Sequence, residues 1–246
     1  MNKQRLNSTE LDQISTLILS GFSLKTIANK LNKSKTTIYY HFRKVKGKTI
    51  IPLTINRLND ELIGEFIGLF AGDGSFYKTK DYKYKIRLHF SCRDQNYVDN
   101  LIKNVLVPLF NKKPMQFLEE NRLNLCYNSK ELYGFIKQYL LWDHHLKKTY
   151  TVRLISNNYS KKFLIGFIRG SLDSDGHFSS DKISFATVST NLKDNIISAL
   201  KILDLTYSVG YYVDKRPNRV GIYHINIPKG EHPKFISLIK PRNMRS

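Results

Sequence analysis

The sequence predicts an α+β fold with α/β layering, made of two αββαββα repeats behind a small all-α domain. Three observations predict it: helical periodicity near the N-terminus, a break in that periodicity over residues 44–49, and a long internal repeat after Leu58. The predicted parts are a domain at 1–48, a linker at 49–57 and a domain at 58–246, with repeats at 58–157 and 158–246. A chain of 246 residues can bury the cores of one medium and one small domain.

Residues 8–46 have the apolar spacing of three short helices. Ser8 suits the N-cap of the first helix, Gly21 ends it, and Ser34 suits the N-cap of the third. The segment 21–44 resembles the helix-turn-helix of resolvases and bacterial regulators. This resemblance implies that the third helix enters a DNA major groove with the side chains of Lys35, Thr36, Tyr39, Tyr40 and Arg43. The alternative is a three-helix packing module with a basic exterior.

After Leu58 the chain repeats itself. The segment from Gly64 to Phe76 recurs 102 positions later as the segment from Gly166 to Phe178. Further matches recur 95 positions apart from Phe90 onward and 100 positions apart from Leu123 onward. Because loops tolerate changes in length, such shifts are expected between the elements of two related halves. Each half is predicted to run helix, two strands, helix, two strands, helix, with antiparallel sheets.

The first helix of each half, near 61–72 and 163–174, has small residues at every fourth position. Such a stripe lets two helix backbones approach closely, so each stripe is expected to pack on the other. Glycine inside a helix costs about 1 kcal/mol relative to alanine, and close packing is a reason to accept that cost. This arrangement would bring the C-terminal ends of the two helices together.

Asp73 and Asp175 occupy those two helix ends. Each faces the negative end of its helix dipole, and two neighbouring carboxylates repel each other and raise each other's pKa. A divalent cation removes the conflict, and oxygen ligands favour Mg²⁺ over zinc or copper. Gly72 and Ser174, which precede the acids, complete the predicted metal site. For one Asp before Gly, a turn acid is the ordinary explanation, but repetition on matched glycine stripes argues against it for the pair.

Both segments, LIGEFIGLFAGDG and LIGFIRGSLDSDG, resemble the LAGLIDADG motif of homing endonucleases, and the likeness covers about residues 58–246. The resemblance implies a pseudo-symmetric monomer that hydrolyses DNA phosphodiesters with Mg²⁺ or Mn²⁺. Asp73 and Asp175 are then its metal-binding and catalytic acids. At the sixth motif position stand Ala71 and Asp173, and we treat Asp173 as structural.

The resemblance also implies a catalytic lysine after the last helix of each half. In the first half Lys147 has the matching place, with Lys148 beside it. In the second half the chain reads PRNMRS where the lysine would come, so three explanations are open: Arg245 substitutes, this half lacks its basic residue, or the chain is shortened here. The second case would give single-strand nicking or weak cleavage.

Alternating strands supply a predicted DNA-binding face. From Lys83 to Ser91 polar and apolar residues alternate, which is typical of a half-buried strand. Basic residues bind phosphate, while Arg, Asn, His and Ser can read base edges. The predicted DNA-binding residues of the two halves are Lys83, Lys85, Arg87, His89, Ser91, Arg122, Asn124, Lys182, Ser184, Lys215, Arg216, Arg219, His224 and Asn226.

The composition agrees with a polyanionic partner. Lys and Arg number 40 against 20 Asp and Glu, a formal charge of +20. No apolar run approaches the roughly 20 residues needed to span a bilayer, and the first residues have no apolar export signal. With only two cysteines and no zinc spacing, neither disulfides nor structural zinc are expected. We expect a protein of the cytoplasm or an organellar matrix, not secreted and not bound to membranes.

The function predicted from the sequence is sequence-specific, Mg²⁺-dependent cleavage of a long pseudo-palindromic DNA duplex. One alternative is a non-catalytic DNA-binding regulator on a degenerate scaffold of the same family. Another is an RNA-splicing maturase that binds intron RNA. Both aspartates are present, and this favours the enzyme.

Overall fold

The computed structural model describes residues 6–47, 52–79, 84–143, 145–213 and 220–243. The chain forms two compact units, Met1–Pro52 and Leu53–Ser246. The predicted linker at 49–57 is therefore too long, because Leu53 belongs to the core of the second unit and Thr54 donates a backbone hydrogen bond to Phe110. Some residues singled out from the sequence lie outside the described residues: Lys83, Lys215, Arg216, Arg219 and Arg245.

The first unit contains three helices, α1 (Ser8–Leu19), α2 (Leu24–Lys30) and α3 (Lys35–Lys46). Asn7, not Ser8, is the N-cap of α1, because its side chain and that of Glu10 form a reciprocal capping box. Ser34 caps α3 as expected. Five buried residues form the core: Ile14, Ile18, Ile27, Ala28 and Ile38. The five candidate DNA-reading residues of α3 are all exposed.

The first half of the second unit begins with helix α4 and continues with two strands, a helical segment, two strands and a helix. Its elements are α4 (Asp60–Asp73), β1 (Gly74–Lys78), β2 (Tyr84–Ser91), η1 (Cys92–Asp94), α5 (Gln95–Leu101), η2 (Ile102–Leu106), α6 (Val107–Phe110), β3 (Met115–Glu119), β4 (Arg122–Asn128) and α7 (Lys130–Ile136). A connection follows, with β5 (Leu140–Leu141), α8 (Lys148–Thr151) and β6 (Arg153–Leu154).

The second half has the same order of main elements. They are α9 (Lys161–Asp175), β7 (Gly176–Phe178), β8 (Ile183–Thr187), α10 (Thr190–Ile202), β9 (Ser208–Tyr212), β10 (Ile222–Ile227), η3 (Lys229–Glu231) and α11 (His232–Ile239). Both sheets are antiparallel, with strand orders β1-β2-β4-β3 and β7-β8-β10-β9. The predicted α+β fold is confirmed.

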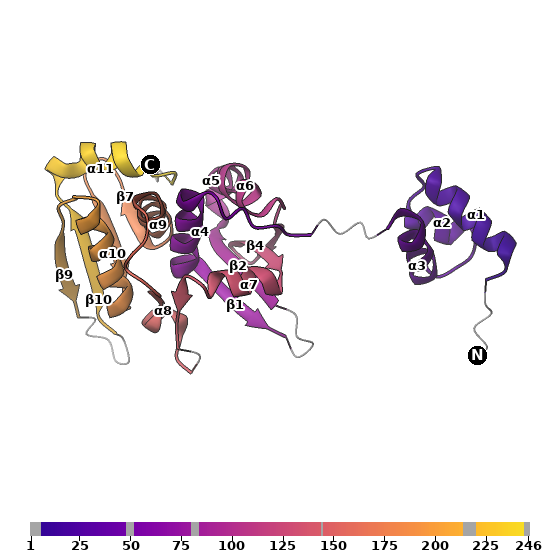
Figure 1. The fold of residues 1–246 in the computed structure, drawn as a ribbon, viewed down its shortest axis with the longest axis horizontal. Coiled ribbons are helices and arrows are strands. Elements are labelled where there is room, and N and C mark those ends of the chain that lie inside the picture. Colours follow the sequence, from indigo (N-terminus) through magenta and orange to yellow (C-terminus); the bar gives the residue numbers. More distant parts are fainter. Residues whose placement is uncertain (1–5, 48–51, 80–83, 144, 214–219, 244–246) are drawn as a thin grey trace. The chain divides into compact units, whose positions relative to one another are not determined.

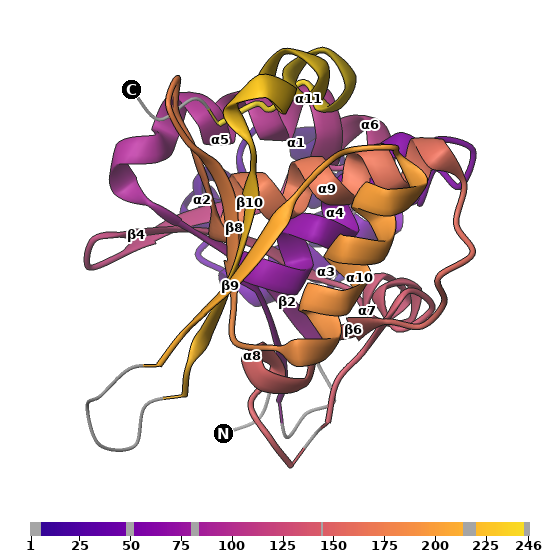
Figure 2. The same ribbon diagram turned by 90° about the vertical axis from the view of Figure 1, so that its left-hand side faces the viewer.

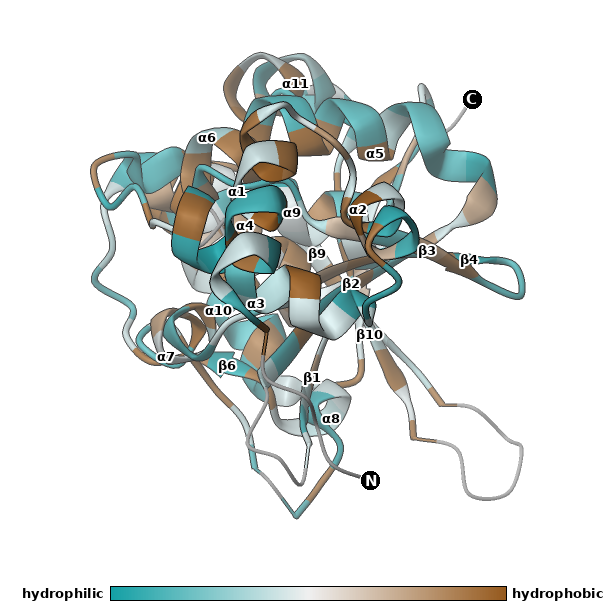
Figure 3. Ribbon diagram, turned by 90° about the vertical axis from the view of Figure 1, so that its right-hand side faces the viewer, coloured by the Kyte–Doolittle hydropathy of each residue, from teal (hydrophilic) through white to brown (hydrophobic). Residues whose placement is uncertain are grey.

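Helices α4 and α9 lie side by side between the two sheets (Figure 1), and each packs against the strands of its own half. Helix α10 covers the sheet of the second half (Figure 2). The apolar residues of both halves form one continuous core, whereas the turn between β3 and β4 is hydrophilic (Figure 3). No helix in the described part of the chain is long and apolar enough to cross a membrane.

Candidate active site at the ends of helices α4 and α9

The two glycine stripes face each other. A Cβ added at Gly64 would collide with the carbonyl oxygen of Phe163, and one added at Gly166 would collide with that of Glu61. One turn later, the second glycine of each stripe has the same relation to the opposite helix. Only glycine permits this approach of two backbones, and the crossing predicted from the sequence is confirmed.

The crossing brings the C-terminal ends of the two helices together. Helix α4 ends at Asp73 and α9 at Asp175. A Cβ at Gly72 would lie 2.8 Å from an oxygen of the Asp175 carboxylate, so this acid sits against the end of the opposite helix. The surrounding protein raises the pKa of the Asp175 carboxyl, although the residue reaches solvent, and the charge of Lys148 opposes that rise.

Lys148 lies at the same place. Its ammonium donates hydrogen bonds to the carbonyl oxygens of Phe70 and Ala71 at 2.6 Å and of Gly72 at 3.1 Å. These three bonds match the three donors of an ammonium group and place a positive charge at the negative end of α4. Burial lowers the pKa of Lys148 to about 8, while the charges of Asp175 and Asp73 raise it.

The prediction of Lys147 as the lysine of this site is wrong by one position. Lys147 is exposed and is the N-cap of α8, whereas Lys148 is the first residue of that helix and points to the end of α4. Two lysines in a row give no periodicity from which the inward one can be chosen. Only the turn that starts α8 selects Lys148.

A cavity of about 550 Å³ opens beside these groups, and its lining includes Asp73, Lys148, His89 and Arg122. A second cavity of about 340 Å³ shares Lys148 and lies toward Trp142. The site is therefore an open cleft next to the outer face of the sheet β1-β2-β4-β3. Asp73, Lys148 and His89 line it, whereas Asp175 lines a separate cavity of about 180 Å³ beside the second sheet.

His89 is held on both sides. Its Nε2 lies 2.7 Å from the Ser75 hydroxyl oxygen and its Nδ1 lies 2.6 Å from the amide oxygen of Asn124. An amide oxygen only accepts, so Nδ1 donates to Asn124, and a neutral ring accepts at Nε2 from Ser75. Asn124 has no exposed surface, since Phe117 of β3 lies directly opposite it. The prediction that Asn124 reads a base is wrong, because this side chain positions His89.

The other predicted residues of the first sheet lie as expected. Along β2 the apolar residues are buried and the polar residues are more exposed. The alternation predicted for this strand is confirmed. Four predicted residues with at least partial exposure occupy the outer face or its end: Lys85, Arg87, Ser91 and Arg122.

The second sheet agrees less well with the prediction. Lys182 is exposed, and His224 and Asn226 are half-buried. Ser184 is buried, because it lies on a central strand between His177 and Asn226 of the neighbouring strands. The predicted role of Ser184 in DNA contact is therefore wrong.

The two residues expected to complete the metal site have other partners. The hydroxyl of Ser174 donates to the carbonyl oxygens of Gly170 and Ser171 in its own helix. The Gly72 carbonyl accepts from Lys148. Of the four predicted ligands, only the carboxylates of Asp73 and Asp175 remain as candidate ligands through their side chains.

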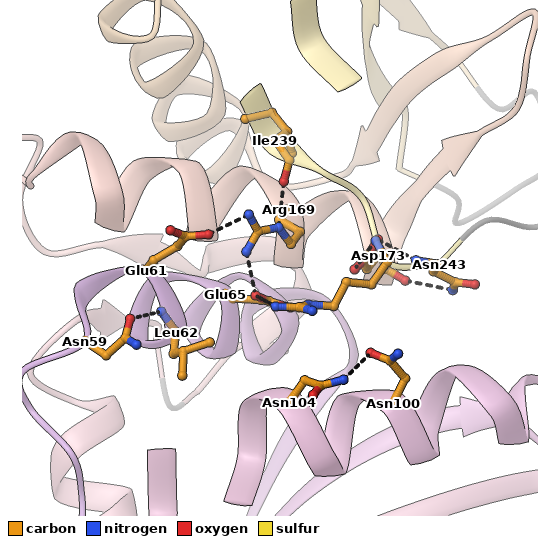
Figure 4. Close-up of polar contacts among 11 residues, drawn as sticks. Asn59, Glu61, Leu62, Glu65, Asn100, Asn104, Arg169, Asp173, Ile239 and Asn243 are labelled. Carbon is orange, nitrogen blue, oxygen red and sulfur yellow. Dashed lines mark hydrogen bonds and ion pairs between the residues drawn. The ribbon is translucent and has the colours of Figure 1, made fainter. Parts of the chain in front are cut away.

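A buried charge network, which was not predicted, joins α4, α9 and the C-terminal segment (Figure 4). Arg169 donates to Glu61 at 2.6 Å, to Glu65 at 2.8 Å and to the carbonyl oxygen of Ile239 at 2.6 Å. Arg242 also donates to Glu65, at 2.5 Å. Glu65 has no exposed surface, so its charge depends on these two arginines.

Asp173 of α9 also binds the segment that follows α11. The backbone N–H groups of Arg242 and Asn243 donate to its carboxylate at 3.4 and 3.2 Å. Burial raises the pKa of Asp173 to about 7, although both N–H groups lower it. These contacts hold the C-terminal segment against α9, which agrees with the structural role predicted for Asp173.

Comparison with known sequences gives a distant relative. No protein-family model matches the chain. It is 28% identical over 146 residues to an uncharacterized protein of Methanocaldococcus jannaschii, a match of 56% of this chain and 47% of that protein. The chain thus spans about half the length of this curated relative.

Comparison with solved structures gives a fold. Mesophilic variants of the homing endonuclease I-DmoI match with a TM-score of 0.53 at 18% identity, over 75% of this chain and 98% of theirs. I-DmoI in complex with DNA and Ca matches with a TM-score of 0.53 at 19% identity, over 74% of this chain and 90% of that chain. With its paired glycine-striped helices and two antiparallel sheets, this chain has the LAGLIDADG fold that its repeated motif predicted.

Proposed function

We propose that this protein is a sequence-specific DNA endonuclease that requires Mg²⁺ or Mn²⁺ and acts as a monomer. One observation carries the proposal: aspartates from the two halves of one chain end two closely packed helices, and the charges of both raise the pKa of Lys148 between them. Each acid faces the unfavourable end of its helix dipole, a position that a bound cation would stabilise. A likeness in fold to I-DmoI, solved with DNA and Ca, supports the choice of DNA as substrate.

The donor set fits a divalent cation that also binds the substrate. Among the described residues, no group of three or more His, Cys, Asp or Glu side chains could hold a metal. Mg²⁺ is commonly bound by one or two carboxylates, with phosphate and water oxygens as its remaining ligands. Asp73 and Asp175 would supply those carboxylates. When bound, the ion would activate water and stabilise the leaving oxygen of a phosphodiester.

The residues around the acids then have distinct tasks. Lys148 places a positive charge beside the scissile phosphate and keeps the end of α4 in position through its three hydrogen bonds. The chain of Ser75, His89 and Asn124 fixes a polar wall of the cleft. The outer faces of the two sheets would hold the duplex, with Lys85 and Arg122 available for phosphate contacts.

Purified protein with its acids replaced tests the proposal. A randomised duplex library, incubated with and without Mg²⁺, should yield a cleaved sequence for the unaltered chain. Asp73→Asn and Asp175→Asn should each lower the cleavage rate at least about 100-fold, as loss of a transition-state stabiliser does, and leave the dissociation constant within about threefold. The control is Asp204→Asn, because Asp204 is exposed and lines neither cavity of the cleft.

Two results would refute the proposal. Tight, specific binding with no cleavage in Mg²⁺ or Mn²⁺ would leave the DNA-binding regulator as the function. Preferential binding of structured RNA over any duplex DNA would support the maturase instead.

A further inference from the structure

The two sheets present different side chains at matched positions. In each half, the residue two positions after Asp73 or Asp175 lies on the first strand of the sheet. The residues paired with it across the other three strands form a row that crosses the sheet. In the first sheet this row is Ser75, Arg87, Cys126 and Met115. In the second sheet it is His177, Ser184, Asn226 and Ser208. The rows begin at the same distance from Asp73 and Asp175, so arginine in one half corresponds to serine in the other. This register corrects the sequence match of Phe90 with Phe185, because Gly74 pairs with Leu88 and Gly176 pairs with Phe185.

Arg87 is held in place before any ligand arrives. Its guanidinium carbon lies 5.1 Å from the centre of the Phe117 ring, and its Nη1 lies 3.6 Å from a carboxylate oxygen of Glu119. The Arg87 side chain is 28% exposed, so the group still reaches the outer face. A planar fork that is already oriented loses less rotational freedom on binding than a free one.

Glu119 also indicates what Arg87 recognises. A carboxylate 3.6 Å from the guanidinium would repel an approaching phosphate, which carries the same charge. The uncharged edge of a base meets a much weaker repulsion. Arginine pairs in bidentate fashion with O6 and N7 of guanine, the most common specific contact in the major groove.

The matched position of the second sheet has no comparable group. Ser184 is buried and short, and the residues directly opposite it are His177 and Asn226. An asparagine side chain pairs with adenine rather than guanine. The described residues of this row therefore contain no arginine that could select guanine.

We infer that Arg87 is a specificity-determining residue that reads a guanine in the half-site under the first sheet, while the matched base pair of the other half-site is not read as guanine. The target would then be asymmetric at a defined place, which differs from the pseudo-palindrome expected from the sequence. The inference rests on the proposed function, because it requires the sheets to lie on duplex DNA.

Selection with the full chain tests the inference. Duplexes selected in the absence of Mg²⁺ should contain an invariant G·C pair in one half-site only. Replacing that pair by A·T should weaken binding about tenfold or more, the discrimination of one bidentate base contact. Attaching an iron chelate to the exposed Cys92, which follows β2, should cut the half-site that contains the guanine.

Arg87→Gln should remove the preference for guanine at that pair, and binding to the A·T variant should equal or exceed binding to the original. Lys85→Gln is the matched control, because it lies two residues away on the same strand and face. It should weaken binding to all sequences alike and reduce the salt dependence. Thermal unfolding of both variants checks that the fold is intact.

The outcomes separate the inference from the proposed function. If no duplex is selected, both are wrong. If a duplex is bound and cleaved but Arg87→Gln keeps the guanine preference, the inference is wrong and the endonuclease stands. Matched guanines in both half-sites would also overturn the inference.

Discussion

Lys147 and Lys148 are neighbours in sequence, but only Lys148 contacts the end of α4. We predict that Lys148→Met lowers the single-turnover cleavage rate about 100-fold, because it removes the positive charge beside the acids and the cap of three carbonyls. Lys147→Met should change the rate less than about threefold, since Lys147 is exposed. Rates measured at saturating enzyme compare the pair directly. Greater loss in Lys147→Met would contradict the assignment of Lys148.

Asp173 should make stability depend on pH. Its pKa is about 7 in the folded protein against an ordinary value of 3.8, so between these values the folded state binds more protons than the unfolded state. Stability should then fall as pH rises from about 4 to 7, by up to about 4 kcal/mol from this group. Asp173→Asn should flatten this fall. Denaturant unfolding at pH 4 and pH 7 measures the free energy of unfolding of both proteins. If this free energy falls equally in the unaltered chain and in Asp173→Asn, the pKa of Asp173 is not raised by folding.

At the scale of elements, the α4–α9 crossing offers a matched pair of glycine substitutions. Gly166→Ala should destabilise the protein by about 1–3 kcal/mol or more, because its Cβ would overlap the Glu61 carbonyl oxygen and force the helices apart. Gly134→Ala in α7 has nothing within 4 Å of the added Cβ and should stabilise the protein by about 0.5–1 kcal/mol.

Urea unfolding of both glycine variants measures these changes. Cleavage should fall in Gly166→Ala alone, because separated helices also separate Asp73 and Asp175. Equal free energies of unfolding in the two variants would show that the close approach of the α4 and α9 backbones does not stabilise the fold.

At the scale of the whole molecule, the N-terminal unit forms its own core and contains neither acid. We propose that it lengthens the recognised site through the exposed residues of α3. Deleting residues 1–52 should shorten the DNase footprint at one end, weaken binding and reduce its salt dependence, while cleavage at high concentration survives. Circular dichroism of the shortened protein is the control for folding. A footprint of unchanged length would show that α3 does not contact this DNA.

The sequence by itself determined the elements and their order. The glycine stripes, the repeated acids and the alternation along β2 are local patterns set by helical and strand periodicity, and each has the predicted place in the structure. The repeat also predicted that two segments about 100 residues apart would meet. Two equivalent helices that each lack side chains on one face have an obvious partner in one another.

Tertiary structure alone decided how exposed individual residues are and which ones pair. The sequence placed Asn124 among the DNA-reading residues, but the side chain has no exposed surface and lies between His89 and Phe117 of the two neighbouring strands. The contact of Glu65 with Arg169 joins positions 104 residues apart, for which no local period exists. Burial and ion pairing depend on residues that are distant in sequence but pack against the side chain in the fold. The periodicity of a helix or strand contains no information about those residues.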